Sequence, residues 1–140
     1  IYHGLQTKLT LGNLDSYRDW GFAGDYVKGM WMMMNHHTPD DWVLATGEAH
    51  SVREFLEVAF SQLDLNYHDY VISSEKYYRP NEVNHLLGDY SKAKTELGWE
   101  PETSFEDLIK IMIENDLKLA EREKTLIEKN LLLPTWEHSL

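Results

Sequence analysis

The chain has 140 residues, 42% hydrophobic and 26% charged, which suits one globular domain or part of a larger one. It carries 24 acidic against 13 basic residues, a formal net charge of −11. That charge, without any basic cluster, disfavours nucleic acid and anionic membranes as partners, and no apolar run is long enough to span a membrane. The absence of cysteine excludes disulfides and thiolate metal sites and fits a reducing, cytoplasmic setting.

The first part of the chain predicts a strand, a loop and a helix. Residues 7–12 alternate polar and apolar side chains and end on glycine, as short strands do, and residues 13–19 read as a polar loop. Residues 23–36 have apolar side chains at helical spacing, which predicts a helix with its apolar stripe in the core. The stripe consists of Tyr26, Val27, Met30, Trp31 and Met34.

The middle of the chain predicts a second strand and a second helix. Residues 42–46 are an apolar run closed by Gly47, which is typical of a buried strand. Ser51, with Glu54 three residues later, forms a capping box that starts a helix. Residues 70–72 are a weaker strand candidate. The apolar face of the helix consists of Val52, Phe55, Leu56, Ala59, Phe60 and Leu63.

The last third predicts a short helix and a long one. Residues 91–97 have a helical pattern that Gly98 stops. Overlapping capping boxes, one starting at Thr103 and one at Ser104, open a long helix that reaches about residue 129. The side chains expected to face inward are Phe105, Leu108, Ile109, Met112, Ile113, Leu117 and Ala120.

This order of elements suits a small α/β or α+β unit. We expect one domain over residues 1–140, because no repeat or long linker interrupts it. Residues 7–12 form the strand leading in, residues 13–129 form a lobe of helices and short strands, and residues 130–140 form a tail that docks or frays. The start, Ile-Tyr-His-Gly, lacks an initiator methionine and a signal-peptide pattern, so we expect a fragment or a processed product.

The stretch of residues 77–101 holds the most informative pair of side chains. Arg79 and Glu82 lie three residues apart, with Pro80 stiffening the backbone between them. Arginine presents a planar fork of donors that fits phosphate oxygens, whereas a carboxylate only accepts and suits the paired hydroxyls of a ribose. On residue types alone, a surface ion pair beside a turn is the more common arrangement.

The sequence lacks convincing motifs for a glycine-rich phosphate loop, a dehydrogenase catalytic pair or a metal site. No glycine-rich phosphate loop follows a strand, and the nearest Tyr-x-x-x-Lys pair, Tyr90 with Lys94, lies at the short helix rather than in a dehydrogenase setting. The adjacent His36 and His37 point in different directions and make a poor metal pair. We therefore expect neither a catalytic residue nor a metal site in this chain.

Several separate motifs, in order along the chain, resemble the GDP-mannose 4,6-dehydratase family. Residues 12–21, Gly-Asn-Leu-Asp-Ser-Tyr-Arg-Asp-Trp-Gly, resemble the family's Gly-Asn-Leu-Asp-x-x-Arg-Asp-Trp-Gly motif, although Phe22 departs from the histidine usual after it. The resemblance covers about residues 8 to 124. It continues through Asp-Tyr-Val (25–27), Ala-Thr-Gly-Glu (45–48), His-Ser-Val-Arg-Glu-Phe (50–55), Tyr-Arg-Pro-x-Glu-Val (78–83) and Gly-Asp-x-x-Lys-Ala-Lys (88–94).

The family consists of extended short-chain dehydrogenases, in which a Rossmann domain binds NADP and carries the catalytic residues. The resemblance implies that this chain is only the smaller C-terminal substrate-binding domain, an α/β unit of α+β-like character, and that the N-terminal Rossmann domain is missing. The family converts GDP-mannose to GDP-4-keto-6-deoxymannose, on the route to GDP-fucose and other deoxysugars. The fragment alone is therefore expected to bind no NADP and to be inactive.

The resemblance also implies roles for particular residues. Arg18 and Arg79 clamp the diphosphate of GDP-mannose, and Glu82 takes the ribose hydroxyls. The strand residues that run past the nucleobase are Lys8, Leu11 and Gly12.

Two alternatives stay open. The chain could be the C-terminal domain of another nucleotide-sugar epimerase or dehydratase, or a non-catalytic interaction module that has lost its ligand. The retained Arg18, Arg79 and Glu82 argue against such a loss, whereas the missing first domain argues for it. Without that domain, apolar surface is expected to be exposed, so we expect a homo-oligomer with helix 23–36 or helix 104–129 at the contact.

Overall fold

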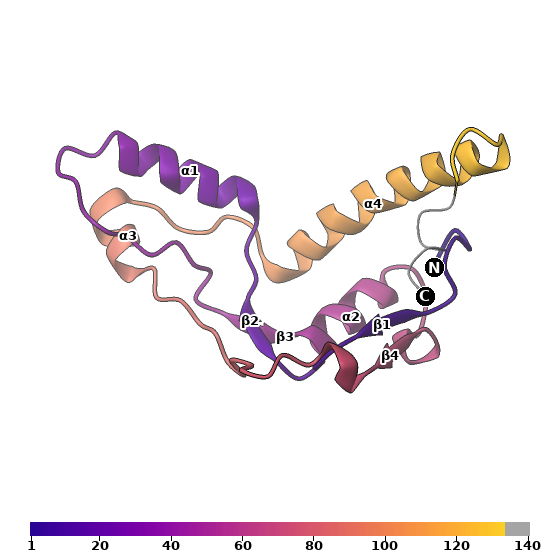
Figure 1. The fold of residues 1–140 in the computed structure, drawn as a ribbon. Coiled ribbons are helices and arrows are strands. Elements are labelled where there is room, and N and C mark those ends of the chain that lie inside the picture. Colours follow the sequence, from indigo (N-terminus) through magenta and orange to yellow (C-terminus); the bar gives the residue numbers. More distant parts are fainter. Residues whose placement is uncertain (134–140) are drawn as a thin grey trace.

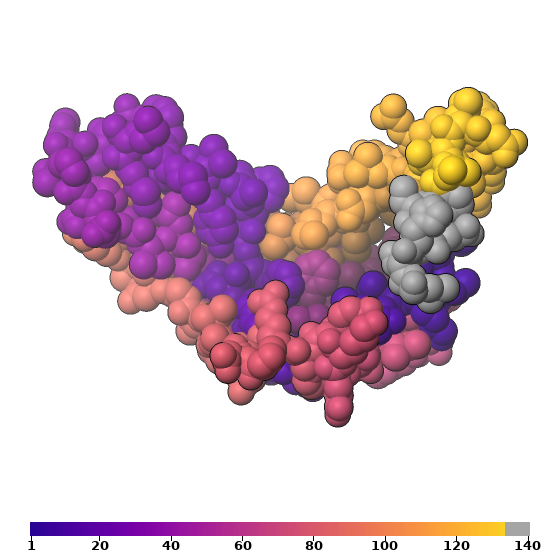
Figure 2. Space-filling model, in the orientation of Figure 1, coloured from indigo at the N-terminus to yellow at the C-terminus, as the bar shows by residue number. Residues whose placement is uncertain are grey.

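A computed structural model describes residues 1–133 of the chain. Two arms rise from a common base of short strands, and the space-filling view keeps this V-shaped outline (Figures 1 and 2). One arm holds helices α1 (Ala23–Met34) and α3 (Ser91–Leu97). The other holds α2 (Val52–Ser61) and α4 (Phe105–Glu128). The fold is a small mixed α/β unit, as the sequence predicts.

The base consists of two separate two-stranded sheets. Strand β1 (Leu9–Leu11) pairs in parallel with β4 (Val71–Ser73), which 3₁₀ turns at Tyr67–Asp69 and Glu75–Tyr77 flank. Strand β2 (Tyr17–Asp19) pairs antiparallel with β3 (Ala49–Ser51). The strands expected within residues 7–12 and near residues 70–72 are confirmed. The expectation of a loop over residues 13–19 is wrong at its end, because β2 forms there through partners distant in sequence.

The arm that holds α2 is built on a conventional apolar core. Leu14, Leu56 and Tyr67 are buried together, and half-buried apolar side chains of β1, β4 and α2 pack against them. The capping box predicted at Ser51 is confirmed, because its hydroxyl accepts the Glu54 amide at 3.1 Å and the Glu54 carboxylate accepts the Ser51 amide at 2.6 Å. These local bonds and the buried Leu56 fix α2 against the sheet.

The arm that holds α1 is organised around Trp99, which is fully buried. The indole Nε1 of Trp99 donates to the backbone oxygen of Asp25 at 2.8 Å. The Asp25 carboxylate, itself buried, accepts the backbone amides of Glu102 and Thr103 at 3.1 and 3.0 Å. Gly98 ends α3 in the left-handed conformation at φ 69°, as predicted, and the chain then turns toward these contacts.

The predicted orientation of α1 is wrong. The residues that α1 buries are Asp25 and Gly29, whereas most of its apolar stripe faces solvent. The Met112 side chain of α4 is also exposed, and only Phe105, Leu108 and Ile109 at the start of that helix are buried. The reason is geometric, since α4 leaves the base and projects beyond the core (Figure 1). Ser104 caps α4 by accepting the Asp107 amide at 3.1 Å, so the capping box predicted to start at Thr103 is wrong.

The strand expected over residues 42–46 does not form. No backbone amide or carbonyl of Trp42–Ala45 bonds to another group within residues 1–133. The segment has the apolar sequence of a strand, but the described residues provide no neighbouring strand to complete a ladder. The first strand after α1 is therefore β3, which begins at Ala49.

Two further expectations concern the surroundings of the domain. No helix in the described residues is both long and apolar enough to cross a membrane. Most of the tail expected at residues 130–140 lies outside the described residues, which end at Leu133.

Candidate functional site

Arg18 lies in the middle of β2 and is fixed by three bonds. Its Nη1 donates to the backbone oxygens of Tyr17 and Val83, both at 2.7 Å. Its Nη2 forms an ion pair with the Glu82 carboxylate, and both side chains are largely shielded from solvent. Two residues separated by 64 positions in sequence are thus brought together.

The loop that carries Glu82 is bonded to β2. The Tyr17 amide donates to the backbone oxygen of Asn84 at 2.8 Å, and the Leu86 amide donates to the backbone oxygen of Tyr17 at 3.1 Å. The rings of Tyr17 and His85 stack with their centroids 5.5 Å apart. These contacts hold the loop along β2. The backbone bonds between the loop and β2 therefore keep Glu82 within reach of Arg18.

Neither partner of the ion pair uses its full bonding capacity. A guanidinium has five N–H donors, of which Arg18 uses three within the described residues. The Glu82 carboxylate uses Oε1, whereas its Oε2 has no partner within residues 1–133. The pair therefore has two spare donors beside a spare acceptor oxygen.

Arg79 lies in the same loop, three residues before Glu82. Its side chain is exposed and forms no ion pair or side-chain hydrogen bond within the described residues. The sequence left open whether Glu82 is a loop partner of Arg79, and the structure gives Arg18 as the partner instead. Arg79 is thus a cation without a counter-ion in the described part of the chain, on a loop held to β2.

The three remaining predicted site residues lie on or beside β1. The Lys8 ammonium donates to the Asp69 backbone oxygen at 2.5 Å, which ties the start of β1 to the 3₁₀ turn before β4. Leu11 is half-buried against the core, opposite Ser73. At Gly12 a Cβ atom would lie 2.6 Å from the backbone oxygen of Tyr77, so this close approach requires glycine. β1 therefore ends against the segment that leads to Arg79.

Asp19 is a structural centre that sequence reasoning missed. Its carboxylate accepts the Thr46 amide at 2.8 Å, the Thr46 hydroxyl at 2.7 Å, the Gly47 amide at 3.1 Å and the Gly88 amide at 3.2 Å. One side chain thus joins β2 to two loops, next to Arg18 in sequence. The sequence shows an aspartate next to the candidate arginine, but no local pattern identifies the distant amides and hydroxyl that donate to its carboxylate.

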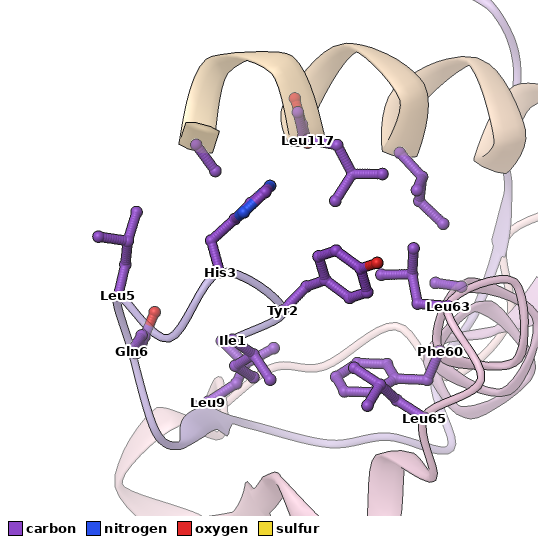
Figure 3. A pocket seen from close by; sticks show the side chains of 14 residues that line it. Ile1, Tyr2, His3, Leu5, Gln6, Leu9, Phe60, Leu63, Leu65 and Leu117 are labelled. Atoms are coloured by element: carbon purple, nitrogen blue, oxygen red, sulfur yellow. The ribbon is translucent and has the colours of Figure 1, made fainter. Parts of the chain in front are cut away.

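Two hollows are not lined by Arg18, Arg79 or Glu82. An apolar cavity of about 290 Å³ opens between the N-terminal segment, α2 and α4, where Tyr2, Phe60 and Leu117 point toward one another (Figure 3). Among the described residues, its lining includes one carboxylate, that of Asp116, and no lysine or arginine. A second cavity of about 300 Å³ is more polar and contains Glu48 and His50.

The motifs set aside in the sequence have structural roles. Tyr90 precedes α3, and the Lys94 ammonium bonds to the Glu100 carboxylate at 2.5 Å. His36 and His37 have ring centroids 6.3 Å apart. No group of three or more His, Asp or Glu side chains in residues 1–133 is arranged to hold a metal ion.

Comparison with known proteins gives the family. The sequence profile of the family described as GDP-mannose 4,6 dehydratase matches residues 1–112. GDP-mannose 4,6 dehydratases 2 and 1 of Arabidopsis thaliana are 58% and 55% identical to the chain over 125 residues. That match covers 89% of this chain but only 34% and 35% of those proteins.

The solved structures give the fold. The RMD protein of Pseudomonas aeruginosa, complexed with NADPH, has a TM-score of 0.71 and 18% identity, over 81% of this chain and 37% of its own. This likeness shows the fold of the chain, a small mixed α/β unit. Because the family profile and these relatives cover most of its residues, the chain belongs to the GDP-mannose 4,6-dehydratase family, and it spans about a third of the length of its curated relatives.

Proposed function

We propose that this chain is the nucleotide-sugar-binding portion of a GDP-mannose 4,6-dehydratase, with GDP-mannose as its ligand. One observation carries the proposal: β2 presents Arg18 with spare donors, and the loop bonded to β2 presents Arg79, which has no counter-ion within residues 1–133, and the spare carboxylate oxygen of Glu82. Those groups match the needs of a diphosphate and of a ribose. Membership of the family supports the choice of guanine nucleotide.

Arg18 and Arg79 have different tasks in this proposal. Arg18 offers two pre-oriented donors to one phosphate, because its other three bonds already fix the guanidinium. Arg79 closes on the other phosphate from the loop. Since the chain carries a net charge of −11, these local cations must hold an anion against an unfavourable overall field. Binding is therefore expected to weaken when either arginine is removed.

Glu82 serves both candidate roles at once. Its Oε1 holds Arg18, and its free Oε2 accepts the ribose hydroxyls. An ion pair with Arg18 and hydrogen bonds from a ribose are thus compatible, whereas a surface ion pair between Arg79 and Glu82 does not form in the described part of the chain. In this proposal the nucleobase passes along β1, near Lys8, Leu11 and Gly12.

The complete enzyme requires a further domain. We propose that a Rossmann domain that partners this chain binds NADP and carries the catalytic residues. We also propose that the product of the reaction is used for GDP-fucose synthesis in the cytoplasm. The chain has no glycine-rich phosphate loop, and its Lys94 is held by Glu100. Dehydratase activity is therefore expected only when the Rossmann domain is joined to it.

Thermal unfolding with GDP, UDP and dTDP tests the ligand class. A ligand that binds the folded state at a hundred times its Kd stabilises it by about 2.7 kcal/mol, a shift of several degrees. GDP should stabilise the chain joined to a family Rossmann domain, and UDP and dTDP should do so less. A larger shift with UDP or dTDP would favour another nucleotide-sugar enzyme. No shift with any of the three would favour the interaction module.

A paired measurement tests the ribose. Glu82→Ala should weaken GDP binding, and it should weaken a dideoxy GDP analogue less, because the analogue has no ribose hydroxyls to lose. Calorimetry on both ligands gives the two losses. Equal losses would restrict Glu82 to holding Arg18 and the loop.

A further inference from the structure

The carboxylate of Asp19, next to Arg18 on β2, fastens two other segments to that strand. Its Oδ1 accepts the Thr46 amide at 2.8 Å and the Thr46 hydroxyl at 2.7 Å. Its Oδ2 accepts the Gly47 amide at 3.1 Å and the Gly88 amide at 3.2 Å. Because a carboxylate offers about four acceptor positions, these bonds leave Asp19 little capacity to bind a ligand itself. Apart from its charge, Asp19 can therefore influence binding only through the segments that it holds.

The loop that carries Arg79 and Glu82 reaches Gly88, where it is held tightly. The Gly88 amide bonds to Asp19, and a Cβ atom at Gly88 would lie 2.2 Å from the side chain of Ala45. Only glycine permits such a close approach of the backbone. The contact with Asp19 therefore fixes the far end of the loop at a place that has no room for a side chain.

The arginines of the candidate site belong to different segments. Arg18 is fixed on β2 by its bonds to Tyr17, Val83 and Glu82, whereas Arg79 lies on the loop and forms no ion pair within residues 1–133. The distance between the two guanidinium groups is therefore set by how the loop lies against β2. A diphosphate needs both groups at the spacing of its two phosphates, so a small displacement of the loop would lose one of the two contacts.

We propose that Asp19 is a positioning residue for the diphosphate site. By holding Gly88 against β2, it keeps the loop, and with it Arg79, at the separation from Arg18 that two linked phosphates require. The bonds from the segment around Thr46 orient the same carboxylate. This inference rests on the proposed function of the two arginines, and it names a residue on which their spacing depends without contact to the ligand.

Charge and position predict opposite effects of Asp19→Ala. The substitution removes a negative charge one residue from Arg18, in a chain of net charge −11, so electrostatics alone would strengthen the binding of an anion. The same substitution leaves the Gly88 amide without its acceptor, so the positioning role predicts weaker binding. Asp19→Asn separates the two effects, because it removes the same charge but keeps one acceptor oxygen. Its affinity should therefore lie between those of Asp19→Ala and the wild type.

Calorimetric titration of GDP and guanosine into the chain joined to a family Rossmann domain tests the positioning role. Asp19→Ala should weaken GDP about tenfold, and Asp19→Asn should weaken it less. Guanosine, which has no phosphates, should be barely affected. The matched control is Asp25→Ala, because the Asp25 carboxylate also accepts two backbone amides, those of Glu102 and Thr103. The control should leave both affinities unchanged.

Hydrogen exchange of the same protein without ligand gives a second measurement. The Leu86 amide bonds to Tyr17 and not to Asp19, so its exchange rate reports on the loop rather than on the substituted bond. The rate should rise in both Asp19 variants and stay close to the wild-type rate in Asp25→Ala. Asp19→Asn keeps both measurements possible if Asp19→Ala does not fold. An unchanged rate in the Asp19 variants would overturn the proposal.

The affinities can overturn the positioning role alone or together with the proposed function. A GDP affinity that is unchanged or increased in Asp19→Ala, while Arg79→Ala still weakens it, would overturn the positioning role alone. Equal GDP losses in Asp19→Ala and Asp25→Ala would do the same, since general destabilisation would then explain both. A wild-type chain that binds no GDP would overturn the proposed function and, with it, this inference.

Discussion

Helices α1 and α2 have similar sequence patterns and opposite orientations. Both carry apolar side chains at helical spacing, but α2 buries Leu56 beside Leu14 and Tyr67, whereas α1 turns Trp31 and Met34 to solvent. α2 begins with a complete capping box, while Phe22 before α1 provides no side-chain cap. Apolar periodicity therefore identifies a face that makes contacts, but it does not tell whether those contacts lie inside this chain.

The two arms are also stabilised by different interactions. The arm of α2 depends on apolar burial, and the arm of α1 depends on bonds made by Asp25 and Trp99. Substitutions in the two helices should therefore lower the free energy of unfolding by different amounts.

Leu56→Ala should lower the free energy of unfolding by about 2–5 kcal/mol, because it leaves a cavity in the core. Trp31→Ala should change it by less than about 0.5 kcal/mol in the monomer, because that side chain is mostly exposed. Urea unfolding at low protein concentration measures both values. Similar costs for the two variants would show that the stripe is packed inside the molecule.

Asp25→Ala should cost about 1–3 kcal/mol, because it leaves the amides of Glu102 and Thr103 without an acceptor in a shielded place. The matched control is Asp116→Ala, an exposed aspartate of α4. The same unfolding measurement should find the control within about 0.5 kcal/mol of wild type. If Asp25→Ala were equally neutral, the polar anchoring of α1 would be wrong.

Glu54→Gln should cost about 0.5–1 kcal/mol at neutral pH. Hydrogen bonds from the Ser51 backbone and hydroxyl hold the pKa of Glu54 below its ordinary value. A carboxylate with a lowered pKa stabilises the fold above its unfolded-state pKa of about 4.3, and this contribution disappears as the pH falls through the lowered folded-state pKa. The difference between wild type and variant should therefore shrink in acid. A difference independent of pH would contradict the ionised capping box.

Local signals in the sequence predicted local structure well. The capping box at Ser51, the cap at Ser104, the stop at Gly98 and the weak strand near residue 71 are confirmed, because each depends on neighbouring residues. β2 and the Asp19 centre were missed, since their partners lie 27 to 69 positions away. The strand expected at residues 42–46 failed for the same reason, because a strand needs a neighbour that no local pattern supplies.

The candidate site was predictable in its residue types more than in its arrangement. The motifs indicated Arg18, Arg79 and Glu82, but the sequence did not show that Glu82 pairs with Arg18. A carboxylate can pair with either arginine, and only the bonding of the loop to β2 selects one. The ligand roles of these residues remain predictions.

Calorimetric titration of GDP and guanosine into the chain, joined to a family Rossmann domain, tests the central claim most directly. Arg79→Ala should weaken GDP about tenfold to a hundredfold, since a charge-assisted bond contributes about 1.5–3 kcal/mol, and it should barely affect guanosine. Arg122→Ala on α4 removes the same charge elsewhere and should leave both affinities unchanged. An unchanged GDP affinity in Arg79→Ala, or an equal loss for guanosine, would contradict the assignment of this loop to the diphosphate.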